Sequence, residues 1–253
     1  FRMTINNINS IAPPFLKKGD LVEIIAPAKL VLSEDVDSAI KTIKEAGFNI
    51  KINSNIFDKH NVFSGSINQR INNLQKALDN TETKAIFFAR GGYGSIQIID
   101  KIDFTLFNKN PKWLIGFSDL TTILIHVQTQ YNIQSIHGPM PYNFSKTTQD
   151  HVSKLFTILK GKIKNIESSS DPLNKLGTSE GKLVGGNLSI LCSLLGSSSF
   201  NQRNQDIILF LEDVDEYLYH VERMIYTLDR SGFLKKIKGL VVGQMTNMLD
   251  NEI

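Results

Sequence analysis

Short apolar runs alternate with segments of helical periodicity through the first half of the chain. The apolar runs predict buried strands near residues 21–26, 48–52, 85–89, 113–116 and 133–136. Apolar side chains at helical spacing predict helices that start at Ser33, span residues 66–79, and run from Asp119 to about Gln130. This alternation indicates a parallel sheet covered by helices on both faces.

The pattern changes between residues 161 and 181, which are rich in Lys, Ser, Gly and Asn. We interpret 161–181 as a linker between an N-terminal domain at 1–160 and a C-terminal domain at 182–253. Beyond the linker, the pattern predicts a helix around Cys192, strands at 207–211 and 239–242, and a helix over 216–228. The fold class we expect is α/β, with a Rossmann-like parallel-sheet N-terminal domain.

Composition and charge exclude several classes of protein. The chain has 253 residues, and its 28 basic and 25 acidic side chains are interspersed, so we expect no nucleic-acid partner. One cysteine excludes an intrachain disulfide, and Cys192 is expected to be a buried apolar side chain. No apolar run is long enough to span a membrane, and no signal peptide is visible. We therefore expect a cytoplasmic protein without membrane association.

A glycine-rich turn follows the strand at 85–89. It reads Arg90-Gly91-Gly92-Tyr93-Gly94-Ser95. Glycines leave backbone N–H groups accessible and permit positive φ, which suits a cradle for an anion or an oxyanion. A tight strand-to-helix turn without chemistry explains the same segment equally well.

Ser118 follows the strand at 113–116 and precedes a predicted helix, which is the position of a nucleophile elbow. The amide of Asp119, at the helix N-terminus, could stabilise developing negative charge. From this segment alone, an alternative is favoured, in which Ser118 only caps the helix.

Glu212 and Asp213 follow the very apolar strand at 207–211. A carboxylate at this position could orient a catalytic histidine or bind a metal. Alternatively, the acids complement the dipole of the following helix. No His, Cys or Asp cluster of ligand spacing accompanies them, so we expect no metal site and no cofactor.

Several of these segments together resemble the L,D-carboxypeptidases, a serine peptidase family that includes microcin-immunity proteins. The resemblance extends from about Lys18 to the end of the chain. It rests on motifs that occur in the family's order: Ala-Arg-Gly-Gly-Tyr-Gly-Ser at 89–95, Ile-Gly-Phe-Ser-Asp-Leu-Thr at 115–121, His-Gly-Pro at 137–139, Gly-Gly-Asn-Leu at 185–188, and the Glu-Asp and Val-Glu-Arg-Met segments within 211–224.

The resemblance implies a Ser-Glu-His triad, with Ser118 as nucleophile and Glu212 as the acid that orients the histidine. It implies an oxyanion hole built from the amide of Asp119 and that of Gly91 or Gly92. It also implies a smaller, β-rich C-terminal domain, with the active site between the two domains.

Four further residues are expected to contact substrate. Arg90 and Arg223 could pair with substrate carboxylates, although structural ion pairs would explain both arginines equally well. Tyr93 and Asn187 belong to the glycine-rich turn and to the Gly-Gly-Asn motif, and they complete the expected substrate-binding set: Arg90, Tyr93, Asn187 and Arg223.

The sequence departs from the family pattern at the catalytic histidine. The family's base lies in a Gly-His segment downstream of the Glu-Asp motif, and we expect it after Ile253. None of the histidines present is a good substitute, namely His60, His126, His137, His151 and His220. His137, at a strand end, comes nearest to one. We therefore expect that the C-terminal domain is incomplete and that the chain as given is catalytically crippled.

The implied reaction is hydrolysis of the amide bond before a C-terminal D-amino acid, with the murein tetrapeptide as substrate and D-alanine as product, in cytoplasmic cell-wall recycling. The family also implies a homodimer. One alternative is a microcin-immunity-type hydrolase of a peptidyl-nucleotide. A second is a non-catalytic small-ligand binding protein, in which the glycine turn holds an anion and Ser118 is only a cap.

Overall fold

The computed structural model describes residues 2–4, 10–162, 165–169, 171–201 and 206–250. Its larger sheet has five parallel strands in the order β3-β2-β6-β7-β8. These strands are β2 (Leu21–Ile25), β3 (Asn49–Ile52), β6 (Thr83–Phe88), β7 (Trp113–Gly116) and β8 (Ile136–His137). In chain order the arrangement is 2-1-3-4-5, the doubly wound order whose ligand crevice lies where the winding reverses, between β2 and β6.

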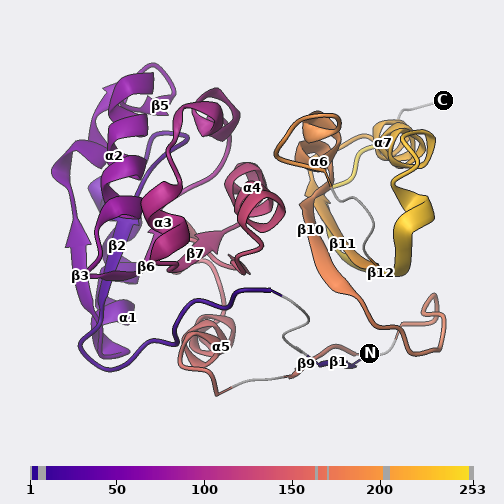
Figure 1. Ribbon diagram of the computed structural model, residues 1–253, viewed down its shortest axis with the longest axis horizontal. Helices are drawn as coiled ribbons and strands as arrows, with labels where there is room; N and C mark the ends of the chain where they lie inside the picture. Colours follow the sequence, from indigo (N-terminus) through magenta and orange to yellow (C-terminus); the bar gives the residue numbers. More distant parts are fainter. Residues whose placement is uncertain (1, 5–9, 163–164, 170, 202–205, 251–253) are drawn as a thin grey trace.

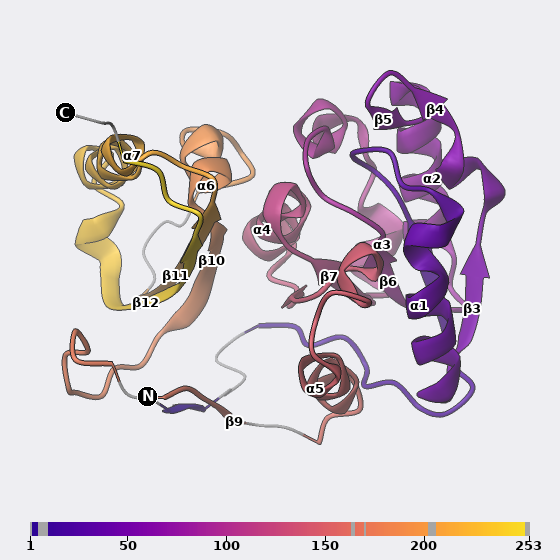
Figure 2. The same ribbon diagram turned by 180° about the vertical axis from the view of Figure 1, so that it is seen from behind.

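Helices cover both faces of this sheet, because its strands carry apolar side chains on both sides. Helices α1 (Ser33–Glu45) and α5 (Gln149–Leu159) pack on the face that bears Ala85 and Phe87. Helices α2 (Ile67–Asp79), α3 (Thr105–Lys109) and α4 (Thr121–Tyr131) pack on the face that bears Ile86 and Phe88. Figure 1 shows α2 and α3 in front of the sheet, and Figure 2 shows α1 and α5 from behind.

The C-terminal part forms a second, three-stranded parallel sheet with β11 at its centre. Its strands are β10 (Lys182–Asn187), β11 (Ile207–Val214) and β12 (Ile237–Thr246), and its helices are α6 (Leu188–Leu194) and α7 (Leu218–Arg230). Leu209 and Leu211 of β11 pack with both helices in a separate core. Helix α4 lies between the two sheets in both views (Figures 1 and 2). The α/β class with a parallel N-terminal sheet is confirmed.

Smaller elements complete the described chain. Two short antiparallel ladders pair β1 (Arg2–Thr4) with β9 (Asn165–Glu167), and β4 (Lys59–His60) with β5 (Phe63–Ser64). Single 3₁₀ turns occupy Ser54–Phe57, Ser95–Gln97, Ile99–Lys101, Ser118–Leu120, Pro141–Asn143 and Leu234–Lys236. Within the described residues, no helix is long and apolar enough to span a bilayer.

The structure departs from the sequence pattern in three places. The helix expected directly after the glycine-rich turn is replaced by two 3₁₀ turns and the short α3. Strand β10 is absent from the predicted elements because its second half, Gly185-Gly186-Asn187, has the composition of a turn. Strand β9 lies inside the segment interpreted as a linker, whose described residues 168–181 contain neither helix nor strand. The domain boundaries themselves stay a prediction.

Candidate active site

Ser118 lies at a sharp turn between β7 and α4. Its φ of 59° is in the left-handed region, which costs a non-glycine residue about 1–2 kcal/mol. Its hydroxyl caps neither the 3₁₀ turn nor α4, and it makes no hydrogen bond with any described residue. The capping interpretation of Ser118 is therefore wrong. The geometry is that of a half-buried serine at a strained strand-to-helix elbow.

The glycine-rich turn lies directly against this serine. A Cβ atom built on Gly91 would be 3.3 Å from Ser118 Cβ and 3.3 Å from the carbonyl oxygen of Phe117. Gly92 has a φ of 103°. Among the described residues, no acceptor takes the amide hydrogens of Gly91, Gly92 or Asp119. These amides are thus available to a bound anion beside the Ser118 hydroxyl.

A buried ionic network fixes the turn to the elbow. The carboxylate of Asp119 accepts hydrogen bonds from the Ser95 amide (2.9 Å) and hydroxyl (2.7 Å). Arg70, fully buried on α2, donates to the carbonyl oxygens of Pro27 (3.1 Å) and Gly94 (3.0 Å). Burial raises the pKa of Asp119, and these hydrogen bonds and the charge of Arg70 oppose the rise. The network thus fixes Asp119 to the glycine-rich turn through the Asp119 side chain.

Glu212 of the second sheet lies beside His137, at the carboxyl edge of the larger sheet. Side chains alternate along β11, so Leu211 and Asp213 face the C-terminal core, whereas Phe210 and Glu212 face the opposite side. There the ring of Phe210 contacts that of His137, with centroids 5.1 Å apart. Glu212 Oε1 lies 3.9 Å from His137 Nε2 at the end of β8. The strand register thus brings the acid to the carboxyl edge of the larger sheet.

Asn187 holds the two acids in place. Its side chain donates to Asp213 Oδ1 (2.8 Å) and accepts from the Ile190 amide (3.1 Å) and the Ser189 hydroxyl (2.8 Å). It also hydrogen-bonds the Glu212 carboxylate. Asn187 is buried, and these contacts use its amide fully. These contacts make Asn187 the N-cap of α6 and a residue that positions the acids. Its contact with substrate stays a prediction.

Two glycines allow β10 to pack closely, Gly185 against β11 of the same sheet and Gly186 against α4. A Cβ atom at Gly185 would lie 1.8 Å from the Phe210 carbonyl oxygen, and one at Gly186 would lie 2.7 Å from Thr121 Oγ1. The Asn187 amide donates to the same Thr121 hydroxyl at 3.2 Å. Backbone of β10 therefore packs directly on the first residue of α4, three positions after Ser118.

The electrostatics of the acid and its histidine neighbour are dominated by burial. Burial and the adjacent Asp213 charge raise the pKa of Glu212 to about 7. Burial lowers the pKa of His137 to about 4. Glu212 Oε1 is buried and has no hydrogen-bond partner among the described residues. Both groups are thus biased toward their neutral forms, and the carboxylate retains a free acceptor.

The other three residues predicted to contact substrate lie in two different parts of the fold. Arg90 and Tyr93 lie in the glycine-rich turn. The Arg90 guanidinium donates to the Leu30 carbonyl oxygen (3.0 Å) and stacks over the Tyr142 ring at 4.2 Å. Arg223 stacks over Tyr219 at 5.2 Å on the exposed side of α7. The contact of Arg223 with substrate stays a prediction.

Sequence reasoning missed Arg70 and the role of Ser95. For Arg70 a signal was present, because this arginine interrupts the apolar stripe of the predicted helix at 66–79. A buried charge on such a stripe indicates a polar network behind it. For Ser95 no signal distinguished a network residue from an ordinary turn residue.

The remaining histidines lie outside this cluster. His126 Nδ1 pairs with the Ser199 hydroxyl (2.9 Å), and His220 Nδ1 on α7 pairs with Glu216 (2.5 Å), which precedes that helix. His60 is exposed in β4, and His151 is exposed in α5. No group of three or more potential metal ligands occurs within the part of the chain that the structure describes.

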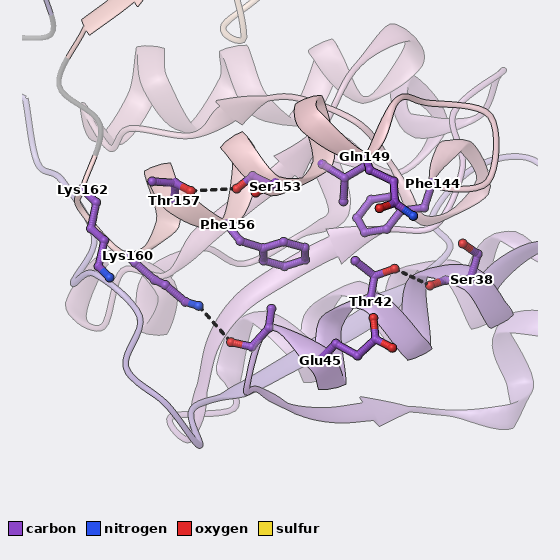
Figure 3. A pocket seen from close by; sticks show the side chains of 12 residues that line it. Ser38, Thr42, Glu45, Phe144, Gln149, Ser153, Phe156, Thr157, Lys160 and Lys162 are labelled. Atoms are coloured by element: carbon purple, nitrogen blue, oxygen red, sulfur yellow. Dashed lines mark hydrogen bonds between the residues drawn. The ribbon is translucent and has the colours of Figure 1, made fainter.

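A cavity of about 380 Å³ lies between α1 and α5, in the outer helical layer (Figure 3). The hydroxyls of Thr42 and Thr157 donate to backbone oxygens one turn earlier, and Lys160 Nζ donates to the Ala46 carbonyl oxygen (2.9 Å). Its polar groups are thus largely engaged within the protein. Neither the glycine-rich turn nor Ser118 lines it.

The chain is similar to known carboxypeptidases over most of its length. The chain matches the LD-carboxypeptidase N-terminal domain over residues 22–138 and the LD-carboxypeptidase C-terminal domain over residues 180–252. A probable murein peptide carboxypeptidase of Bacillus subtilis is 32% identical over 245 residues, which cover 93% of this chain and 75% of that protein.

Two solved structures share the fold across both domains. The muramoyltetrapeptide carboxypeptidase from Oxalobacter formigenes has a TM-score of 0.76 and 26% identity, covering 90% of this chain and 78% of that one. An MccF-like protein from Bacillus anthracis has a TM-score of 0.80 and 25% identity, covering 94% and 81%. Together with the matched domains and the Bacillus subtilis relative, these similarities show that the chain belongs to the LD-carboxypeptidase family and is a peptidase-type hydrolase.

Proposed function

We propose that the protein is a serine-type L,D-carboxypeptidase that hydrolyses the amide bond before the C-terminal D-alanine of a murein tetrapeptide. One observation carries the proposal: a serine at positive φ, with its hydroxyl unbonded, lies against free amides on a glycine-rich turn. A nucleophile and preorganised oxyanion donors are the two parts that acyl transfer requires at one point.

In this mechanism Ser118 Oγ attacks the scissile carbonyl, and the amides of Asp119 and of Gly91 or Gly92 stabilise the oxyanion. The imidazole that accepted the serine proton gives it to the departing amine, and D-alanine leaves. Water then hydrolyses the acyl-enzyme. Glu212 orients the imidazole that accepts the serine proton and stabilises its charged form. The buried, unbonded Oε1 of Glu212 is an acceptor suited to an imidazole N–H.

Glu212 can perform this role only when ionised. Its raised pKa means that the resting site favours the neutral acid at mildly acidic pH. A protonated imidazole within hydrogen-bond distance would lower that pKa again. Formation of the imidazolium during attack and ionisation of Glu212 therefore reinforce each other.

The decisive experiment uses the full-length protein with a purified murein tetrapeptide and measures D-alanine release. Wild type should release D-alanine, and a fluorophosphonate adduct should map to Ser118. Ser118→Ala should lose both by at least about 10³-fold. Absence of adduct and of D-alanine from the wild type would instead support the non-catalytic binding protein.

A second candidate activity is hydrolysis of a peptidyl-nucleotide of the microcin type. The similarity to an MccF-like protein, which extends over 94% of this chain, favours keeping it. The two activities would use the same Ser118 and Glu212. Parallel turnover assays with the murein tetrapeptide and with an aminoacyl-sulfamoyl nucleoside separate them by the ratio of kcat/KM.

The biological setting is proposed with the activity. We place the enzyme in the cytoplasm, in cell-wall recycling, and as a homodimer, on the basis of the family resemblance. Cell fractionation tests the location, and light scattering of the full-length protein tests the oligomeric state.

A further inference from the structure

A pocket of about 440 Å³ opens beside the glycine-rich turn, at the point where the winding of the larger sheet reverses. It receives Lys29 from the segment after β2, Arg90 from the segment after β6, and Lys59 from β4. In doubly wound sheets, ligands bind in this crevice at the carboxyl ends of the strands. The position alone therefore indicates a binding site.

The pocket is positively charged. Its lining includes three cations and a single acid, Asp35. The Asp35 carboxylate accepts the Leu32 amide at 2.9 Å as part of the capping box of α1, so it is already engaged. Within the described chain, neither Lys29, Lys59 nor Arg90 forms an ion pair. The excess positive charge is thus available to an anion from solution.

Arg90 is held in an orientation suited to that anion. One of its nitrogens donates to the Leu30 carbonyl oxygen, and the guanidinium stacks over Tyr142. Lys146 lies 3.9 Å from the centroid of the same ring. The hydrogen bond from Lys146 and the charge of Arg90 lower the pKa of the Tyr142 phenol, as expected in a positive potential.

Two glycines connect this pocket to Ser118. A Cβ atom at Gly92 would lie 2.9 Å from Lys29 Cδ, whereas one at Gly91 would lie 3.3 Å from Ser118 Cβ. The pocket and Ser118 therefore lie against successive residues of the same turn. Every carboxypeptidase substrate carries the terminal carboxylate, so only a side-chain carboxylate can make this pocket selective for acidic peptides.

We infer that Lys29, Lys59 and Arg90 form a subsite for a side-chain carboxylate of an acidic peptide substrate. This inference rests on the proposed function for the identity of the substrate. It adds a specificity determinant that Ser118 and Glu212 do not supply, because neither can distinguish an acidic peptide from a neutral one.

The test compares two acetylated tetrapeptides that end in L-lysyl-D-alanine and carry either glutamate or glutamine two residues before the scissile bond. Binding to full-length Ser118→Ala protein is measured by calorimetry. The glutamate peptide should bind about 10-fold more tightly, a difference of about 1.4 kcal/mol. Adding Lys29→Met and Lys59→Met should reduce this preference to about 2-fold or less.

Lys41→Met is the matched control, because Lys41 is an exposed lysine on α1 that pairs with Glu45. It should keep the 10-fold preference. Equal binding of both peptides, or an unchanged preference in the double lysine variant, would overturn the subsite. Because binding is measured without turnover, a preserved preference in a protein that never releases D-alanine would refute the proposed function and leave the subsite standing.

Discussion

His137 Nε2 lies 3.9 Å from Glu212 Oε1, and this approach joins the last strand of the larger sheet to the central strand of the smaller one. The two side chains come from positions 75 residues apart in the chain, as their numbers show. Burial acts on them in opposite directions, because it raises the pKa of the acid and lowers that of the base. This pair therefore links the pH dependence of folding to that of catalysis.

Glu212→Gln should make the protein more stable at pH 8 and leave its stability unchanged at pH 4. In the wild type, the pKa of Glu212 is raised from 4.5 to about 7 in the folded state. The unfolded chain therefore loses its proton first, and stability falls as pH rises from about 4.5 to 7. The variant lacks this loss, so it should gain about 2 kcal/mol at pH 8, measured by urea unfolding at each pH.

His137→Gln provides the opposite slope as a control. The folded-state pKa of His137 is lowered from 6.5 to about 4. The contribution of His137 to the free energy of unfolding is fully present above about pH 6.5 and is lost as pH falls toward 4. The variant should be less sensitive to acid over that interval. If both variants changed the pH dependence of stability in the same direction, the opposite pKa shifts of Glu212 and His137 would be contradicted.

Ser118→Gly should stabilise the fold and abolish turnover. Glycine relieves the left-handed backbone at Ser118, and after allowance for the greater freedom of the unfolded chain the gain should be about 0.5–1 kcal/mol. Ser118→Ala keeps the strain and should stay within about 0.5 kcal/mol of wild type. Asn61→Gly, at a φ of 54° in an exposed turn, should gain less, because Asn tolerates the left-handed region better than Ser does. Thermal unfolding measures all three, and a loss of stability in Ser118→Gly would argue against strain at the elbow.

Ser95→Ala should weaken catalysis because it loosens Asp119, whose amide belongs to the proposed oxyanion hole. The change removes a buried 2.7 Å hydrogen bond to Asp119, which should cost about 1–3 kcal/mol of stability. Because the Asp119 amide is then less well fixed, kcat should fall by about 10-fold with little change in KM. Ser193→Ala removes an exposed hydrogen bond to a backbone oxygen and should change neither value. A rise in KM alone would assign Ser95 to substrate binding instead.

Gly185→Ala should disrupt the pairing of β10 with β11 within the second sheet. The added methyl group would overlap the Phe210 carbonyl oxygen, at a backbone angle that alanine avoids. We expect at least about 3 kcal/mol of destabilisation by urea unfolding. Gly177→Ala, where a methyl group would meet nothing within 4 Å, should stay within about 0.5 kcal/mol of wild type. Equal stability of both variants would show that β10 can shift without cost.

Much of the larger sheet could be predicted from hydrophobic pattern, because its strands are buried on both faces and stand out as continuous apolar runs. Strand β7 matches its predicted bounds of 113–116. Strand β10 could not be found in this way, since Gly185 and Gly186 are required by contacts with Phe210 and Thr121 that are remote in sequence. A glycine pair selected by packing looks like a turn when only neighbouring residues are considered.

The candidate site shows the same division. Ser118 and Glu212 each follow an apolar strand, and strand ends are recognisable in sequence, so both were predicted. The interpretation of Ser118 as a helix cap was wrong, because local composition cannot show whether a hydroxyl reaches an amide. Asn187 was predicted to contact substrate, and the parallel register of β10 with β11 also sets it beside Glu212 and Asp213.

The sequence by itself determined the α/β class, the strand ends that carry chemistry and the family to which they belong, because periodicity and motif spacing are local properties. The tertiary structure alone decided which of those ends meet. Strand order sets Lys29 beside Arg90, and β10 packing on α4 brings Glu212 to His137. These juxtapositions depend on register and on backbone contacts between distant segments, and no local pattern in the chain encodes them.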